Sequence, residues 1–408
     1  MSVEIRSITT QEVLKYRRSV RAGFGNPDTT DDDPSWALDV TVPVDRTRAA
    51  FDADRIVATL RSFPTELTVP GGAAVPAGAV TAVTCQPTHR RQGLLTKLMT
   101  EDLRDSADRG ELLDVLIASE YPIYGRFGYG PAVQSTRWEL DKGKARFAYG
   151  GAGTVEIIDN ETLRKEAPPI FDRVRVARPG MISRTDLMWD GAADLRRPPE
   201  EKPWQGFRVL CRDGDGVAQG WASWTVKDSW EDMIPGSSAR VNDLCAATPQ
   251  AEARLWRFLS ELDLIVTIIG ADRPADELLP HLLVDGRAAR QVYRGDFLWV
   301  RLLDVVGSLE TRSYAAEGRV VLDVTDPQGL AGGRYLLEAT PDGARCRRTD
   351  ESADLTIPVR TLGAAYLGGV RLAQLHAAGW LDEERPGAVA TADRLFWGDV
   401  TPWCNTWF

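Results

Sequence analysis

The sequence contains few residues of the kinds that build disulfide frameworks and metal sites. Its 408 residues include only five cysteines and three histidines. The cysteines are too far apart to form a CxxC pair and their number is odd, so neither a disulfide framework nor a zinc site is expected. His89, His281 and His376 lie in separate segments, which argues against a metal site built on imidazoles. We therefore expect no bound metal.

Long apolar runs and an excess of positive charge are also missing. No run of about 18 apolar residues is present, so we expect no membrane span. The first residues, Met1 to Arg6, lack the basic and then apolar pattern of a signal peptide, which predicts a cytoplasmic protein. The formal net charge of −10 argues against nucleic acid as a partner, because phosphates must be neutralised by clustered Lys and Arg. A cationic partner suits the charge better, although such a charge also simply keeps a protein soluble.

A strand, a glycine turn, a helix and another strand follow one another in the first third of the chain. Segments 55–63 and 78–85 are rich in β-branched residues and are flanked by Gly or Pro, which predicts strands. Leucines with helical spacing predict a helix over 94–104, and the apolar segment 112–118 predicts a central strand. The order is that of a βαβ-like unit.

The same order of elements recurs between residues 206 and 269. The glycine turn is absent from this diverged copy, which has Ala246 to Ala251 in its place and should not bind a pyrophosphate in the same way. From about residue 294 the pattern changes to short strands followed by helices, which predicts an α+β domain with an antiparallel sheet. The chain is thus predicted to form three domains of the α/β (α+β) class, at 1–145, 146–293 and 294–408.

The glycine turn, His89 to Leu94, has the composition of an anion site. Backbone N–H groups at the start of a helix point toward a bound phosphate, and the helix dipole favours negative charge there. Gly93 permits a close approach of the backbone, and Arg90 and Arg91 add positive charge. The turn therefore predicts phosphate binding, with an ordinary surface loop as the alternative.

This turn resembles the coenzyme A pyrophosphate motif of GNAT acetyltransferases, Arg/Gln-x-x-Gly-x-Gly/Ala, with Leu95 in place of the final small residue. Residues 87–95 and the Gly- and Tyr-rich segment 118–131 are similar to the Eis (enhanced intracellular survival) N-acetyltransferases, and 280–290 is similar to the second domain of that family. The resemblance covers essentially the whole chain. It implies two GNAT-like domains in tandem followed by a sterol-carrier-protein-like domain, with acetyl-coenzyme A as co-substrate and a homohexameric assembly.

The resemblance also assigns the co-substrate site. Val83, Thr84 and Cys85 match the segment that runs along the acetyl-coenzyme A arm, and Ser119 and Glu120 match its far side. The pyrophosphate loop is matched by Arg90, Arg91, Gln92, Gly93, Leu94, Leu95 and Thr96.

Two further residues match catalytic groups of the family. Tyr124 matches the general acid, since a phenol with a pKa of ~10 stays protonated and can donate to a departing thiolate. Without the resemblance, Tyr121 and Tyr129 would be equal rivals, and packing in a glycine-rich turn is the alternative role for Tyr124.

The general base implied by the resemblance is the C-terminal carboxylate, carried by Phe408. The last segment, 401–408, contains large aromatic residues and no polar tail, whereas ordinary chain ends are polar and frayed. We expect the terminus to be docked in a pocket, where burial would raise the pKa of the carboxyl and make it a better base. Docking for stability alone is the alternative.

The acceptor is expected to be an amine of the aminoglycoside, polyamine or lysine type. Family members that modify aminoglycosides tend to carry acidic groups near the tail and the N-terminal helix, whereas this chain has Trp407 and Asn26 in those regions. This departure favours a flatter or less cationic amine, because Trp407 offers an aromatic face. The Asp-rich segment that follows Asn26 is predicted to be a solvated surface turn or, alternatively, a lid over a cation-binding cleft. Two other functions remain open: a lipid-binding protein that works through its third domain, and a coenzyme A-binding pseudo-enzyme that serves as an assembly module.

Overall fold

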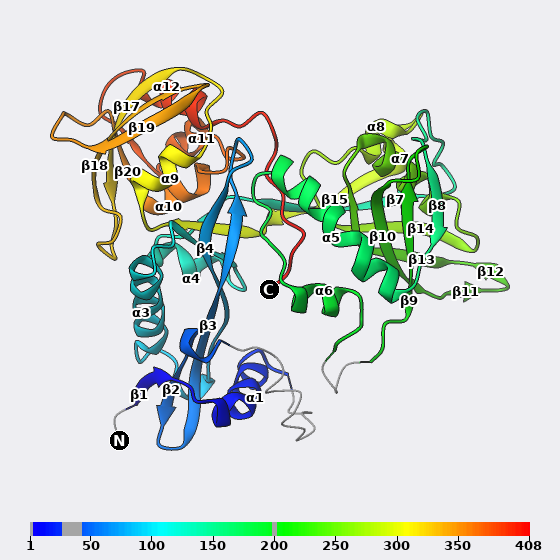
Figure 1. Cartoon of the computed structure of the whole chain (residues 1–408), viewed down its shortest axis with the longest axis horizontal. Coiled ribbons are helices and arrows are strands. Elements are labelled where there is room, and N and C mark those ends of the chain that lie inside the picture. Colours follow the sequence, from blue (N-terminus) through cyan, green and yellow to red (C-terminus); the bar gives the residue numbers. More distant parts are fainter. Residues whose placement is uncertain (1–2, 27–42, 198–201) are drawn as a thin grey trace.

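The computed structural model describes residues 3–26, 43–197 and 202–408 (Figure 1). The Asp-rich segment after Asn26 lies outside the described residues. Two seven-stranded sheets and one five-stranded sheet organise the described part of the chain. The helix predicted over 94–104 corresponds to α3 (Leu94–Asp108), and α1 (Val13–Gly23) precedes it in the chain. No helix in the described ranges is long and apolar enough to cross a membrane.

The first sheet has the strand order β1-β2-β3-β4-β5-β16-β6. Its strands are β1 (Glu4–Ser7), β2 (Thr47–Asp52), β3 (Arg55–Thr68), β4 (Ala74–Cys85), β5 (Leu113–Ile117), β16 (Leu298–Leu302) and β6 (Gly130–Pro131). Successive side chains of a strand point to opposite faces. Ala50 accordingly packs with α3, whereas Ala49 and Phe51 pack with α1, so the two helices cover opposite faces of the sheet. The parallel pair β4 and β5, joined by α3, is the predicted βαβ-like unit.

The second sheet repeats this unit and has the order β15-β7-β14-β13-β10-β9-β8. Its parallel pair is β13 and β14, and the connecting helix α7 starts where the Thr248 side chain accepts a hydrogen bond from the Ala251 N–H. The strands are β7 (Gln134–Asp141), β8 (Thr154–Ile157), β9 (Gly206–Arg212), β10 (Ala218–Lys227), β13 (Ser237–Ala246), β14 (Ile265–Arg273) and β15 (Ala289–Asp296). The helices are α5 (Asn160–Ala177), α6 (Asp186–Ala192), α7 (Pro249–Ser260) and α8 (Leu279–Leu282), and β11 (Trp230–Glu231) and β12 (Ile234–Pro235) form a separate hairpin.

The third sheet has the order β19-β18-β17-β20-β21. Its strands are β17 (Gly318–Thr325), β18 (Gly333–Thr340), β19 (Gly343–Arg348), β20 (Leu355–Pro358) and β21 (Asp382–Glu383), with helices α9 (Val305–Thr311), α10 (Val359–Ala365), α11 (Leu372–Ala377) and α12 (Ala388–Phe396). The prediction of an antiparallel sheet is wrong for one pair, because β20 runs parallel to β17. Asp354 fixes this arrangement: its backbone N–H donates to the Val321 carbonyl and its carboxylate accepts from the Val321 N–H.

Two strands cross between the predicted domains. β7 falls in the predicted range 1–145 but pairs with β14 and β15 of the second sheet. β16 falls in the range 294–408, and its predicted grouping with the strands of the third domain is wrong, because it pairs with β5 and β6 of the first sheet. The domain ranges themselves stay predictions.

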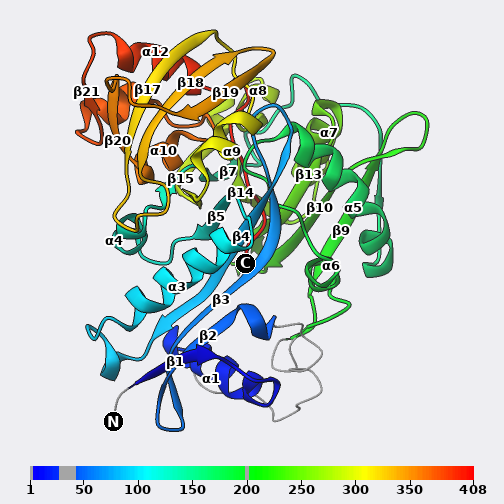
Figure 2. The ribbon, with the colours of Figure 1, turned by 60° about the vertical axis from the view of Figure 1, so that its left-hand side comes forward.

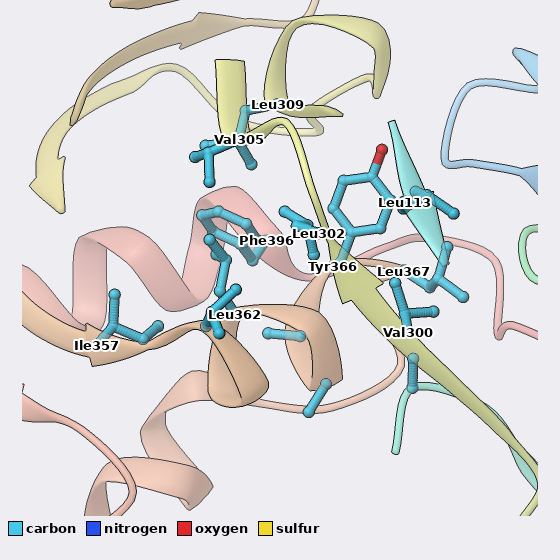
Figure 3. Close-up of a cluster of buried hydrophobic side chains, with 14 of the residues drawn as sticks. Leu113, Val300, Leu302, Val305, Leu309, Ile357, Leu362, Tyr366, Leu367 and Phe396 are labelled. Carbon is cyan, nitrogen blue, oxygen red and sulfur yellow. The ribbon is translucent and has the colours of Figure 1, made fainter. Parts of the chain in front are cut away.

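The first and third domains share one hydrophobic core. Figure 3 shows Leu113 and Val300, from the first sheet, close to Tyr366 from the third domain. Arg301 of β16 forms a fully buried ion pair with Asp326, which follows β17, at 2.7 Å. These contacts join the two domains into one packed unit.

The chain after α12 returns to the middle of the molecule. Residues 397–408 have no helix or strand, and they run from the third domain to a position between the first and second sheets (Figures 1 and 2). Trp403 and Cys404 are buried along this path. The aromatic tail is therefore docked on the protein, as expected from its composition.

Candidate active site

The central strands of the first sheet separate at one end. β5 pairs with β4 only along Ala77–Val80, while β4 continues to Cys85. The register between β3 and β4 shifts next to this point, and Ala82 has a φ of +53°, which marks a β-bulge. The Thr59 hydroxyl donates to the Ala82 carbonyl at 2.7 Å and holds the bulge in place. The opening leaves Val83, Thr84 and Cys85 without β5 as a neighbour.

The glycine turn lies beside this opening, at the start of α3. Gly93 is the N-cap residue with a φ of +76°, a conformation that favours glycine. The first hydrogen bond of the helix runs from the Lys97 N–H to the Gly93 carbonyl at 3.0 Å. The amides of Leu94, Leu95 and Thr96 therefore have no partner within the helix, which is the arrangement that binds anions at helix N-termini.

The turn and the open end of β4 line a cavity of about 760 Å³. Every residue predicted to bind acetyl-coenzyme A lines this cavity except Gln92. Among the described residues of its walls, Arg90, Arg91 and Arg126 face a single carboxylate, that of Glu120. Within the described residues, neither Arg90 nor Arg91 has an ion-pair partner. Two guanidinium groups are thus free to meet an anion.

Cys85 also lines this cavity as a thiol. Burial raises its pKa, and the positive charge of Arg90 acts in the opposite direction. The side chain therefore stays protonated at neutral pH and offers an apolar wall rather than a thiolate.

A second cavity of about 500 Å³ opens on the other side of Tyr124. It lies between the bulged part of β4, the ends of β14 and β15, and the tail. Two side-chain carboxylates, Asp272 and Asp296, stand in its walls together with Trp407 and Phe408. Among the described residues that line it there is no lysine, arginine or histidine. The two cavities are therefore opposite in charge.

Tyr124 stands where the two cavities meet, since it lines both of them. Its side chain is 4% exposed, and burial raises the pKa of the phenol, while a hydrogen-bonding contact with Ser119 lowers it. Of its rivals, Tyr121 is 52% exposed and packs edge-on against Trp299. Tyr129 is fully buried, and its hydroxyl donates to Asp114 at 3.4 Å. Neither rival lines either cavity.

The end of the tail forms one wall of the second cavity. The Phe408 ring packs edge-on against Phe63, with 5.6 Å between ring centroids. The Trp407 indole N–H donates to the Asp272 carboxylate at 3.1 Å, and its ring packs against Phe297. The last residue of the chain and Tyr124 thus line the same cavity.

Several residues of the site were not found from the sequence. Phe24, at the end of α1, lines both cavities, and Arg126 lines the cationic one. Asp272 and Asp296 are supplied by the second sheet and line the anionic one. Arg126 lies within the Gly- and Tyr-rich segment 118–131, whose resemblance gave a signal for it, whereas Phe24, Asp272 and Asp296 belong to no motif identified in the sequence and are brought to the site only by the fold. Within the described ranges, no group of three or more His, Cys, Asp or Glu residues is placed to hold a metal ion.

Known proteins resemble the chain along its whole length. Residues 4–132 and 180–302 each match an acetyltransferase (GNAT) domain, and residues 305–405 match a sterol carrier protein domain. An "uncharacterized N-acetyltransferase" of Streptomyces avermitilis is 41% identical over 100% of this chain and 99% of its own length. The N-acetyltransferase Eis of Mycobacterium tuberculosis is 37% identical over 82% of this chain and 81% of its own. The crystal structure of Eis1 from Mycobacterium abscessus, 29% identical, superposes with a TM-score of 0.85 and covers 99% of this chain and 100% of that one.

Proposed function

The chain belongs to the Eis family of GNAT N-acetyltransferases, and from this premise we propose that it transfers the acetyl group of acetyl-coenzyme A to a cationic amine within the two joined cavities. That it is an acetyltransferase follows from the family. The co-substrate, the acceptor and the roles of individual residues are the proposal.

The opposite charge of the two cavities carries the proposal. The cavity with three arginines suits a carrier that bears phosphates. The other cavity suits a protonated amine, because the charged side chains among its described lining residues are the two carboxylates of Asp272 and Asp296. They meet at Tyr124 and Val83, next to the bulge in β4. If the thioester lies at this junction, the pyrophosphate of the same molecule lies in the cationic cavity, and the amine approaches the thioester from the anionic cavity.

The residues of the cationic cavity fit acetyl-coenzyme A. Donors for a diphosphate are provided by the open amides at the start of α3 and by Arg90 and Arg91, which have no ion-pair partner in the part of the chain that the structure describes. The free edge of β4 at Val83 and Thr84 provides backbone groups for the extended arm. When bound, acetyl-coenzyme A supplies an activated acetyl group, whose carbon exchanges its bond to sulfur for a bond to nitrogen.

Two groups of the chain move protons in the proposed reaction. The Phe408 carboxylate takes a proton from the acceptor ammonium and passes it to solvent, which frees the nitrogen lone pair for attack. Once the C–N bond has formed, the nitrogen loses its second proton to solvent. Tyr124 donates its phenol proton to the departing sulfur and regains a proton from solvent. The products are an amide and the free thiol of coenzyme A. The high pKa of the buried Tyr124 keeps the proton in place until it is needed.

The walls of the anionic cavity indicate the class of acceptor. Asp272 and Asp296 provide negative charge, and Tyr293, Phe297 and Trp407 provide aromatic faces. This combination attracts organic cations through charge and cation–π contact. Polyamines, aminoglycosides and lysine side chains meet the requirement, whereas neutral arylamines do not. The family resemblance further implies a homohexamer, which light scattering on purified protein would test.

A thiol-release assay with acetyl-coenzyme A tests the proposal. The panel contains polyamines, aminoglycosides, lysine peptides and arylamines, and calorimetry with coenzyme A runs in parallel. We expect coenzyme A binding and turnover with the cationic acceptors only. Turnover with arylamines alone would contradict the charge argument. Binding without turnover for any amine would favour the pseudo-enzyme alternative.

The lipid-binding alternative receives no support from the third domain. Its interior holds Tyr366 and Phe396, which are buried among leucines (Figure 3). The buried Arg312 guanidinium donates to the backbone carbonyls of these two residues, at 2.5 and 3.0 Å. Aromatic rings and a charged group thus fill this part of the interior of the third domain.

A further inference from the structure

The tail of the chain is held by an arginine of the second domain. Nη2 of Arg184 donates to the carbonyl of Asn405 at 3.0 Å, and its Nε donates to the Thr406 hydroxyl at 2.9 Å. The Arg184 side chain is only 6% exposed, and Thr406 is 4% exposed. These bonds fix the backbone two and three residues before the terminal carboxylate.

Asp243 of β13 holds the arginine and the tail together. Its carboxylate lies 3.5 Å from Nη1 of Arg184, and it accepts a hydrogen bond from the Asn405 side-chain amide at 3.0 Å. The pairing of β13 with β10 shifts register immediately before this residue in the chain, because Asn242 is bulged out between Val241 and Asp243. A bulge changes the direction of the neighbouring side chains. Here the residue after the bulge is Asp243, whose carboxylate contacts the tail.

The arginine itself is rigidly placed. Its guanidinium lies over the Phe171 ring at 4.4 Å and over the Trp189 ring at 4.9 Å. Aromatic faces restrict the orientation of a planar guanidinium, so that its donors are arranged before they meet the tail. A lysine would keep the charge but could not reproduce the fork.

Asp272 of β14 is a third anchor. Its carboxylate accepts from the Trp407 indole N–H at 3.1 Å, and its carbonyl accepts from the Trp403 indole N–H at 2.9 Å. Its φ of +52° is unusual for a residue other than glycine. A strained backbone conformation of this kind is kept only where many surrounding contacts stabilise it. Such conformations are common at functional sites.

We infer that the second GNAT domain, which lacks the anion-binding turn, acts as a clamp that positions the C-terminal carboxylate, with Arg184 and Asp243 as the positioning residues. The inference rests on the proposed role of Phe408 as general base. A general base at the end of a chain works only if that end is fixed in position. A displacement of a catalytic group by about 1 Å can lower the rate of the reaction about 100-fold. The clamp bonds lie close enough to the terminus to provide this fixation.

The test compares Arg184→Met with Arg164→Met in the full-length protein. Arg164 is a matched control, since it lies on the same domain and pairs with Asp186 and Asp190 but does not contact the tail. Arg184→Met should lower kcat about 10- to 100-fold, leave the affinity for coenzyme A unchanged, and remove the acidic limb of the pH profile, which reports the base. It should also speed the release of Phe408 by carboxypeptidase, followed by mass spectrometry. Arg164→Met should change none of these properties.

Two further variants complete the test. Arg184→Lys should recover part of the lost kcat, because it keeps the charge and one donor. Thr406→Val removes a single clamp bond without leaving a buried charge, and it should change kcat and the release of Phe408 in the same directions by a smaller factor. It serves as the test if Arg184→Met does not fold.

The outcomes separate the clamp from the role of the carboxylate. A tail that stays as resistant to carboxypeptidase in Arg184→Met and Thr406→Val as in the parent protein would overturn the clamp. A tail that is released faster while kcat and the pH profile stay unchanged would support the clamp and overturn the role of Phe408 as base.

Discussion

At the scale of single residues, the junction at Tyr124 leads to the first prediction. Tyr124→Phe keeps the ring that packs edge-on against Tyr129 and removes only the hydroxyl. Because the proton donor is lost, kcat should fall by a factor of about 100 or more, with the affinity for coenzyme A unchanged by calorimetry. Tyr121→Phe is the control, since Tyr121 lines neither cavity and should retain full activity. An equal loss in both variants would make Tyr124 a packing residue.

The pH dependence of the same residue has a definite sign. A general acid works only while it is protonated, so its activity is lost as the pH rises through its pKa. Burial raises the pKa of Tyr124 above the ordinary value of 10. The basic limb of the kcat profile should therefore have its midpoint above pH 10, and more than half of kcat should remain at pH 10. A basic limb centred near pH 8 would assign the acid to another group.

The sequence predicted the residues that follow one another along the chain, and it missed those that only the fold brings together. Arg90 to Thr96 form one turn, and their role follows from a local pattern; only Gln92 does not line the cavity. Asp272 and Asp296 come from the ends of strands in another sheet. A carboxylate at a strand end has no distinctive neighbours in sequence, so pattern alone could not select these two.

At the scale of elements, the turn between β4 and α3 contains the residues proposed to bind the pyrophosphate, and one of them, Arg91, has a strained backbone conformation. Arg91 has a φ of +65°, in the left-handed region that costs an ordinary residue about 1–2 kcal/mol. Arg90 has a φ of −63° and no such strain. The turn thus places a charged side chain at a position that glycine would occupy more easily.

The next prediction uses this contrast. Arg91→Gly and Arg90→Gly each remove one charge from the cavity, so both should weaken coenzyme A binding in calorimetry. Only Arg91→Gly relieves strain, and its free energy of unfolding should exceed that of Arg90→Gly by about 1 kcal/mol. Urea denaturation measures the difference. Equal stabilities would show that the conformation of Arg91 carries no cost.

Element type was predictable where the pattern was local, and strand pairing was not. The helix predicted over 94–104 extends to Asp108 because its buried face continues beyond Leu103 to Ser106 and Ala107, before the turn at Gly110. The direction of β20 depends instead on the bonds between Asp354 and Val321, which are far apart in sequence. Hydrogen bonds between residues far apart in the chain produce no periodic pattern in the sequence, so strand pairing could not be predicted from it.

At the scale of the whole molecule, the sequence suggested three successive domains, and the structure interleaves them. β16 lies in the range predicted for the third domain but pairs within the first sheet. β7 lies in the range predicted for the first domain but pairs within the second sheet. Both exchanges pair distant segments. The tail begins in the third domain, which is fixed relative to the first domain because the two share one core. The hydrogen bond from Arg184 of the second domain then fixes the end of the tail.

The last prediction tests this shared core. Leu302 is fully buried between the first and third domains, and Leu302→Ala should cost about 2–5 kcal/mol through the cavity it leaves (Figure 3). Because one core serves both domains, slowly exchanging amides of β4 and β17 should lose equal protection in hydrogen-exchange mass spectrometry. Leu259→Ala is the matched control, since Leu259 is equally buried but belongs to the separate core of the second sheet. It should reduce the protection of β14 and leave β4 and β17 as they were. Protection lost from β4 but retained in β17 would show that the third domain unfolds independently, and the tail would then depend on the second domain alone for its position.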